Sequence, residues 1–135
     1  MSELRVIRSR ELSAQTSQTP GMLRRTAIGA DTVGARGMWV GLVTMEAGVS
    51  SGAHHHGESE SAIYMIAGRI RMRYGAKLEK MMEAGPGDFL YVPPLLIHQE
   101  INLSPDEPVK CIVVRDSQDN VVVNVDMPAA TLHRS

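Results

Sequence analysis

The chain has 135 residues, enough for one domain and hardly for two. Its 14 Lys and Arg against 15 Asp and Glu give a formal net charge of −1, so it lacks the basic excess that drives binding to nucleic acid. The first residues form no apolar signal segment, and no run approaches the ~18 apolar residues that cross a bilayer. We therefore expect a soluble cytoplasmic protein that binds neither nucleic acid nor membrane.

Short segments rich in Val, Ile, Met and Tyr alternate with turns, because 12 Gly and 7 Pro divide the sequence. This pattern predicts an all-β fold, either a sandwich or a barrel. The candidate strands are residues 4–8, 22–28, 37–46, 62–66, 69–74, 77–82, 88–92, 97–102, 109–115 and 121–125.

We predict one domain with three parts. Residues 1–36 supply N-terminal strands and a loop that complete the barrel or contact a partner, and residues 37–125 form the barrel itself. Residues 126–135 form an irregular tail, in which His133 is expected at the surface.

The residues with the clearest chemical potential begin at a histidine run. Residues two apart on a strand share a face, so His54 and His56 are expected to direct their imidazoles to one point while His55 faces away. Glu60, beyond the turn at Gly57, is a candidate carboxylate ligand. A histidine run alone favours a solvated loop over a metal site.

The segment from Arg69 to Tyr74 alternates strictly between arginine and apolar or aromatic residues, so its three arginines are expected on one face of a strand. We interpret this stripe as a solvent-facing surface, with a small anion-binding patch or a dimer contact as the alternatives. Further along, the single cysteine, Cys111, lies in an apolar run and is expected to be a buried, unreactive thiol.

His98 is expected to supply a third imidazole from a neighbouring strand. Three imidazoles and one carboxylate suit a divalent transition metal better than Ca²⁺ or Mg²⁺, which prefer oxygen ligands. The predicted metal ligands are therefore His54, His56, Glu60 and His98, and the predicted cofactor is Fe, Mn, Zn, Ni or Co.

Two separated patterns resemble the two motifs of the cupin superfamily, specifically its small single-domain members. The first runs from Gly48 through the histidine run and Glu60 to Gly68, and the second from Gly87 through Pro93 and Pro94 to His98 and Asn102. The resemblance implies a double-stranded β-helix, or jelly-roll barrel, that holds a metal on the four predicted ligands. It also implies a homodimer and turn positions for Gly48, Gly68 and Gly87.

The sequence departs from the cupin pattern at two positions. Seven residues separate Glu60 from Gly68 where six are usual, so Ser61 occupies the strict register of the carboxylate. A one-residue bulge would restore Glu60, and Glu58 is the competing carboxylate. Leu95 stands where the second motif usually has glycine, so the turn before His98 is expected to differ in shape.

Residues near the metal would decide the chemistry. Glu100 shares the strand parity of His98 and is a candidate catalytic base. Tyr64 is a second candidate, facing inward if the strand is regular from Glu60 and outward if a bulge intervenes. Trp39, Phe89 and Tyr91 are expected to pack in the core.

Three functional hypotheses follow. The first is a metalloenzyme, an oxygenase or an isomerase or lyase, that acts on a small polar molecule bound in the barrel. The second is a non-catalytic module that binds or senses a small ligand such as a sugar. The third is a β-protein whose histidines hold no metal.

Overall fold

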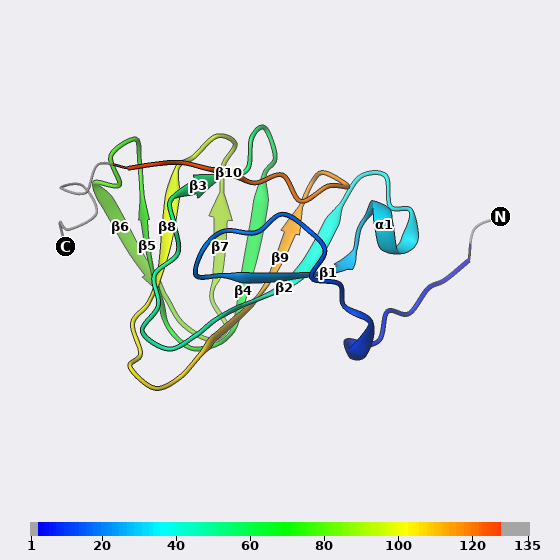
Figure 1. Ribbon diagram of the computed structural model, residues 1–135, viewed down its shortest axis with the longest axis horizontal. Helices are drawn as coiled ribbons and strands as arrows, with labels where there is room; N and C mark the ends of the chain where they lie inside the picture. Colours follow the sequence, from blue (N-terminus) through cyan, green and yellow to red (C-terminus); the bar gives the residue numbers. More distant parts are fainter. Residues whose placement is uncertain (1–2, 128–135) are drawn as a thin grey trace.

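The computed structural model describes residues 3–127 and has the all-β jelly-roll architecture that the sequence predicts. Figure 1 shows two facing layers of antiparallel strands, with the N-terminal segment extending away from one end. One sheet has the order β1-β2-β9-β4-β7 and the other the order β10-β3-β8-β5-β6. Segments far apart in the sequence therefore become neighbours inside the barrel.

The described residues form ten strands and two short helical turns. The strands are β1 (Leu23–Ile28), β2 (Trp39–Met45), β3 (His54–His55), β4 (Ser61–Ala67), β5 (Ile70–Tyr74), β6 (Lys80–Ala84), β7 (Phe89–Val92), β8 (His98–Asn102), β9 (Val109–Arg115) and β10 (Val123–Asn124). The helical turns are a 3-10 turn at Ser9–Glu11 and α1 at Ala30–Val33. None of these helices is long and apolar enough to cross a membrane.

The core forms because alternate residues of facing strands point inward. On β9 the buried residues are those at every second position, and β2 and β4 show the same alternation. The buried apolar side chains are Trp39, Val43, Met45, Ile63, Met65, Ile70, Met72, Ala84, Val92, Val109, Cys111 and Val113. One end of this interior carries the polar residues described below.

Three predicted strands differ in the structure, and one of them, expected at residues 121–125, is shortened to β10 at Val123–Asn124. Residues 4–8 form no strand, and Leu4 is 94% exposed because nothing pairs with this segment. The strand expected at 77–82 begins at Lys80 instead, because a hydrogen bond from the Leu78 amide to the Gly75 carbonyl closes a turn there. The short strand β3 was not predicted as a strand.

The glycines of the two motifs occupy turns, as expected. Gly48, Gly68 and Gly87 have φ values of +70°, +83° and +90°, a region that side-chain-bearing residues rarely adopt. At Gly68 an added Cβ would also lie 2.7 Å from the carbonyl oxygen of Pro108. Leu95, which replaces the usual glycine before His98, adopts φ +64° and so reaches the left-handed region without a glycine.

Candidate metal centre

Three imidazoles from two parts of the chain meet inside the barrel. His54 on β3 and His98 on β8 are cross-strand partners, and His56 lies directly after β3, which ends at His55. One nitrogen of each ring lies within 4.8 Å of the corresponding nitrogens of the other two. All three residues are buried, with at most 4% of their surface exposed. This is the convergence that the spacing of the histidines predicts.

Each imidazole is fixed by a hydrogen bond to a backbone carbonyl. A carbonyl oxygen only accepts, so the Nδ1 atom of each ring carries the proton and Nε2 keeps its lone pair. The lone pairs of His54 and His98 therefore face the interior, whereas that of His56 accepts a hydrogen bond from Arg115, which a metal would have to replace; the rings are held in place without a metal. The three bonds run from His54 to Gly52 (2.9 Å), from His56 to Val121 (2.9 Å) and from His98 to Leu96 (2.8 Å).

Burial keeps two of these imidazoles neutral. It lowers the pKa of His54 to about 4, against the attraction of Glu100. Burial, with the nearby charge of Arg115 adding to it, places the pKa of His56 far below its ordinary value. Because metals bind the neutral form of imidazole, both rings are in the binding state at neutral pH.

The carboxylate beside the imidazoles belongs to Glu100 on β8. Its Oε1 atom lies 3.5 Å from Nε2 of His54 and 3.6 Å from Nε2 of His98. Complete burial raises the pKa of Glu100, but its electrostatic interactions with His54, His98, Arg24 and Arg115 outweigh burial and bring the pKa below its ordinary value. Glu100 therefore faces the imidazoles as a carboxylate.

The structure does not bring Glu60 to the imidazoles. It lies just before β4, in which Ser61 and Ile63 point inward, so the alternation directs Glu60 to the outside. There its carboxylate accepts a hydrogen bond from the Tyr91 hydroxyl, and its amide donates to Asp116. Glu58, the competing carboxylate, is exposed as well.

Tyr64 also lies on the outer face, 37% exposed and packed against Phe89. The irregularity in β4 falls between Met65 and Ala67 rather than before Tyr64, so Glu60 and Tyr64 keep the same outward parity. Phe89 and Tyr91 are exposed rather than in the core, whereas Trp39 is buried as expected.

Two buried arginines, which the sequence analysis did not select, stand beside the centre. Arg115 on β9 is 2% exposed, and its Nη2 donates a hydrogen bond of 3.1 Å to Nε2 of His56. Arg24 on β1 is 1% exposed and donates to the Thr19 hydroxyl. Burial lowers the pKa of Arg115 to about 9. The signal in the sequence was the inward parity of Arg115 after Val109, Cys111 and Val113.

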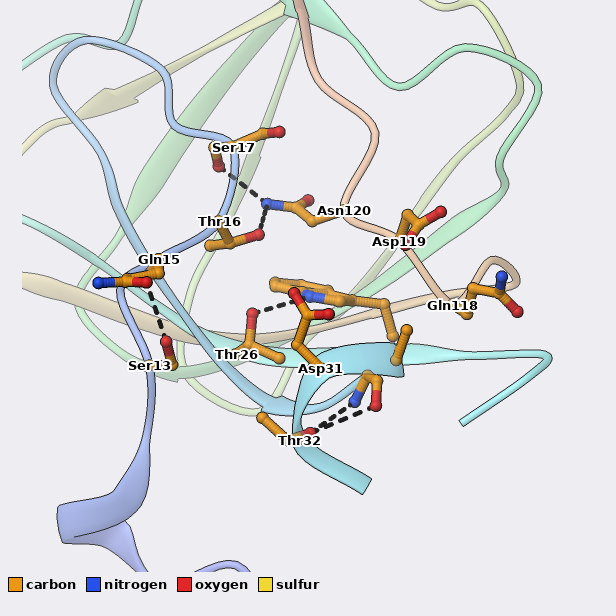
Figure 2. A pocket seen from close by; sticks show the side chains of 13 residues that line it. Ser13, Gln15, Thr16, Ser17, Thr26, Asp31, Thr32, Gln118, Asp119 and Asn120 are labelled. Carbon is orange, nitrogen blue, oxygen red and sulfur yellow. Dashed lines mark hydrogen bonds between the residues drawn. The ribbon is translucent and has the colours of Figure 1, made fainter. Parts of the chain in front are cut away.

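Arg115 is held by residues on its other side. Its NH1 donates to Asn120 Oδ1 at 2.8 Å, and its guanidinium lies over the Trp39 ring, 5.1 Å from the centroid. Figure 2 shows how Asn120 is fixed in turn, by hydrogen bonds to Thr16 and Ser17 of the N-terminal loop. The N-terminal segment thereby helps to position a charge at the centre of the barrel.

A cleft of 230 Å³ opens between the two sheets beside His98. Its lining includes inward-facing side chains of β5 and β7 together with the loop before β8. The lining residues other than His98 are apolar, aromatic or proline: Met72, Tyr74, Met82, Leu90, Tyr91, Val92, Pro93 and Leu96. A small molecule placed here would reach the imidazole of His98 from the edge of the barrel.

The donor set fits a divalent transition metal. Two buried atoms that face each other, His54 Nε2 and Glu100 Oε1, have no hydrogen-bond partner in the structure. An ion between them would satisfy both, and metal bonds of about 2.1 Å at tetrahedral angles separate two donor atoms by about 3.4 Å. Imidazole nitrogen with a single carboxylate favours Mn, Fe, Co, Ni or Zn over Ca or Mg.

Comparison with known families gives one match. The family model described as the cupin domain matches residues 41–115, which contain all three histidines and Glu100. A search of curated protein sequences gave no match.

Solved structures with the same fold include enzymes. The polyketide cyclase RemF from Streptomyces resistomycificus has a TM-score of 0.74 and 19% identity, over 93% of this chain and 88% of that one. An oxalate decarboxylase, OxdC from Bacillus subtilis, has a TM-score of 0.72 and 22% identity over 86% of this chain. This chain covers only 31% of OxdC, and another structure of that enzyme is described by its Mn(II) centres.

A third structure of similar size is a conserved protein with a double-stranded β-helix domain from Klebsiella pneumoniae. It has a TM-score of 0.69 and 16% identity, over 92% of this chain and 99% of that one. At these identities the likeness extends to the fold.

Proposed function

Because the chain belongs to the cupin family, we propose that it is a metal-dependent enzyme that holds one divalent transition metal in its barrel and acts on a small molecule bound beside that metal. The observation that carries this proposal is the convergence of His54, His56 and His98: each Nδ1 donates to a carbonyl, so each Nε2 can ligate a metal, that of His56 once Arg115 gives up its hydrogen bond to it. The Mn(II) centres named for the Bacillus subtilis oxalate decarboxylase support a transition metal.

We assign the carboxylate of the centre to Glu100 rather than to Glu60. Its distances of 3.5 and 3.6 Å to two imidazole nitrogens match the separation of donor atoms that share one ion. Glu100 therefore acts as a metal ligand and not as the base that its strand parity first suggested. Glu60, on the outer face, takes no part in the centre.

A bound metal would supply Lewis-acid activation of a substrate oxygen or of water. The protein's own residues do the rest. The buried imidazoles exclude bulk water, the cleft beside His98 orients the substrate, and Arg115 places a positive charge next to His56. Four protein ligands leave one or two positions on the metal for the substrate, which suits an oxygenase or an isomerase or lyase.

The proposal is tested by metal analysis of protein purified without a metal-affinity step. We expect about one equivalent of a divalent transition metal per chain, and substoichiometric metal in the His98→Ala variant. Oxygen uptake by the Fe(II)-loaded protein over a panel of diols and keto acids separates the oxygenase from the isomerase. Metal below stoichiometry in both the wild type and the variant would refute the proposal.

A non-catalytic ligand-binding role is the second candidate. It is favoured by the lining of the cleft, which apart from His98 is apolar, aromatic or proline. Saturable ligand binding without turnover for any metal would identify this role.

The prediction of a homodimer stays a prediction. The exposed apolar residues Tyr64, Ile66, Phe89, Ile112 and Val114 are consistent with it, because they gather on the outer face of β4, β7 and β9. Light scattering coupled to gel filtration decides whether the chain is a dimer.

A further inference from the structure

The charges inside the barrel do not balance. Arg24 and Arg115 are both buried and both act electrostatically on Glu100, which is the one acidic side chain among the buried residues that the structure describes. Two buried guanidinium groups thus share one buried carboxylate, so positive charge is in excess here even before a metal binds. A buried charge without a counter-charge is costly, so this interior favours a bound anion.

The position for that anion is marked by Ser61. This residue pairs with Arg115 on one side and with Val92 on the other, so the three inward side chains form a row across β9, β4 and β7. The Ser61 hydroxyl is buried and has no hydrogen-bond partner in the structure, and neither has Nε of Arg115. Two unsatisfied polar atoms therefore belong to neighbouring residues of the same inner face.

Six residues also separate Ser61 from Gly68, the spacing at which the first motif has its glutamate. At the far end of the row, Val92 lines the apolar cleft beside His98. The inner face thus changes from cationic at Arg115 to apolar at Val92 over two strand spacings.

We propose that the barrel binds an organic monocarboxylate, with its carboxylate between Ser61 and Arg115 and its apolar body in the cleft beside His98. Two hydrogen-bond donors, the Ser61 hydroxyl and Nε of Arg115, match the two oxygens of a carboxylate. This inference names the substrate class of the proposed metalloenzyme. It rests on that function only for the metal beside the ligand, because Ser61 and Arg115 would bind the carboxylate without a metal.

The test is calorimetric titration at low salt of EDTA-treated and of Mn²⁺-loaded protein with three probes. The probes are 4-methylpentanoate, its neutral amide 4-methylpentanamide, and acetate, which has the charge without the apolar body. We expect 4-methylpentanoate to bind the metal-free protein about 30-fold tighter than the amide, the cost expected when one partner of a buried charge pair is missing. Acetate is expected to bind more weakly than 4-methylpentanoate.

Variants test the assigned residues. Arg115→Gln and Ser61→Ala should weaken binding of the carboxylate but not of the amide, whereas Arg71→Gln, an arginine paired with Glu83 outside the barrel, should change neither. Glu100→Gln should strengthen carboxylate binding to the metal-free protein, because it removes the competing negative charge. A folding defect cannot produce that gain, so this variant keeps the test decisive if Arg115→Gln does not fold.

Equal affinity for the carboxylate and the amide would overturn the inference, as would an equal loss in the Arg71→Gln and Arg115→Gln variants. Metal content is measured separately. A protein that binds metal but shows no preference for the carboxylate retains its proposed function and loses its proposed substrate class. A protein that prefers the carboxylate but binds no metal supports this inference and refutes the metalloenzyme.

Discussion

The Oε1 atom of Glu100 lies 3.5 Å from Nε2 of His54, and neither atom has a hydrogen-bond partner in the structure. A neutral imidazole nitrogen and a carboxylate oxygen are both acceptors, so they cannot bond to each other. The pair is stable in a buried site only when something positive lies between them. A metal ion meets that requirement. Because only the folded chain presents this site, binding of the ion would stabilise the folded state.

Replacing Glu100 by Gln should lower metal affinity at least about 10- to 100-fold, because the centre loses its only carboxylate and with it the negative charge that offsets the ion. Titration of the metal-free protein with Zn²⁺ in a calorimeter measures this directly. The matched control is Glu60→Gln, which changes a carboxylate on the outer face. A larger loss in Glu60→Gln than in Glu100→Gln would return the ligand role to Glu60.

The metal-free protein should lose stability as the pH falls from 6.5 to 4. In the unfolded chain His54 takes up a proton below about pH 6.5, but in the folded chain its pKa is about 4 because of burial. The unfolded state therefore binds more protons in this window, and the free energy of unfolding decreases by about 3 kcal/mol for His54 alone. Urea unfolding at pH 7 and pH 5 measures the change. Equal midpoints with equal slopes would contradict it.

Cys111 should not react in the folded protein. Burial raises the pKa of its thiol to about 12 from 9.0, which lowers the thiolate population at pH 8 by about 10³-fold. An aromatic disulfide reagent should therefore label the native chain very slowly and the urea-unfolded chain completely. Rapid labelling of the native protein would show that β9 opens locally.

Asn120→Ala should destabilise the fold by about 1–3 kcal/mol, because it leaves the buried guanidinium of Arg115 and the loop at Thr16 and Ser17 without their shared partner. The matched control is Asn124→Ala, whose side chain makes one exposed hydrogen bond to the Gln18 carbonyl and should cost far less. Urea unfolding of the two variants compares them. Equal stability of both would mean that Asn120 does not hold Arg115.

The sequence predicted the fold and the three imidazoles for a local reason. The alternation of apolar residues indicates which face of a strand is buried, and the spacing of His54 and His56 indicates that their side chains point the same way. Both can be predicted from a few neighbouring residues. The motif spacing then linked this pair to His98. The strand expected at residues 4–8 failed because an apolar segment forms a strand only where another strand offers its backbone, and that depends on the rest of the fold.

The carboxylate and the arginines were decided by the tertiary structure. Whether Glu60 or Ser61 points inward depends on where β4 begins its pairing with β7 and β9, and a shift of one residue exchanges the two faces. Glu100 and Arg115 become neighbours of the imidazoles only when two sheets close over one another. Sequence determined which residues can ligate a metal, since that is a property of side chains and their local spacing. Register and sheet packing, which are set by the whole chain, determined which of them meet.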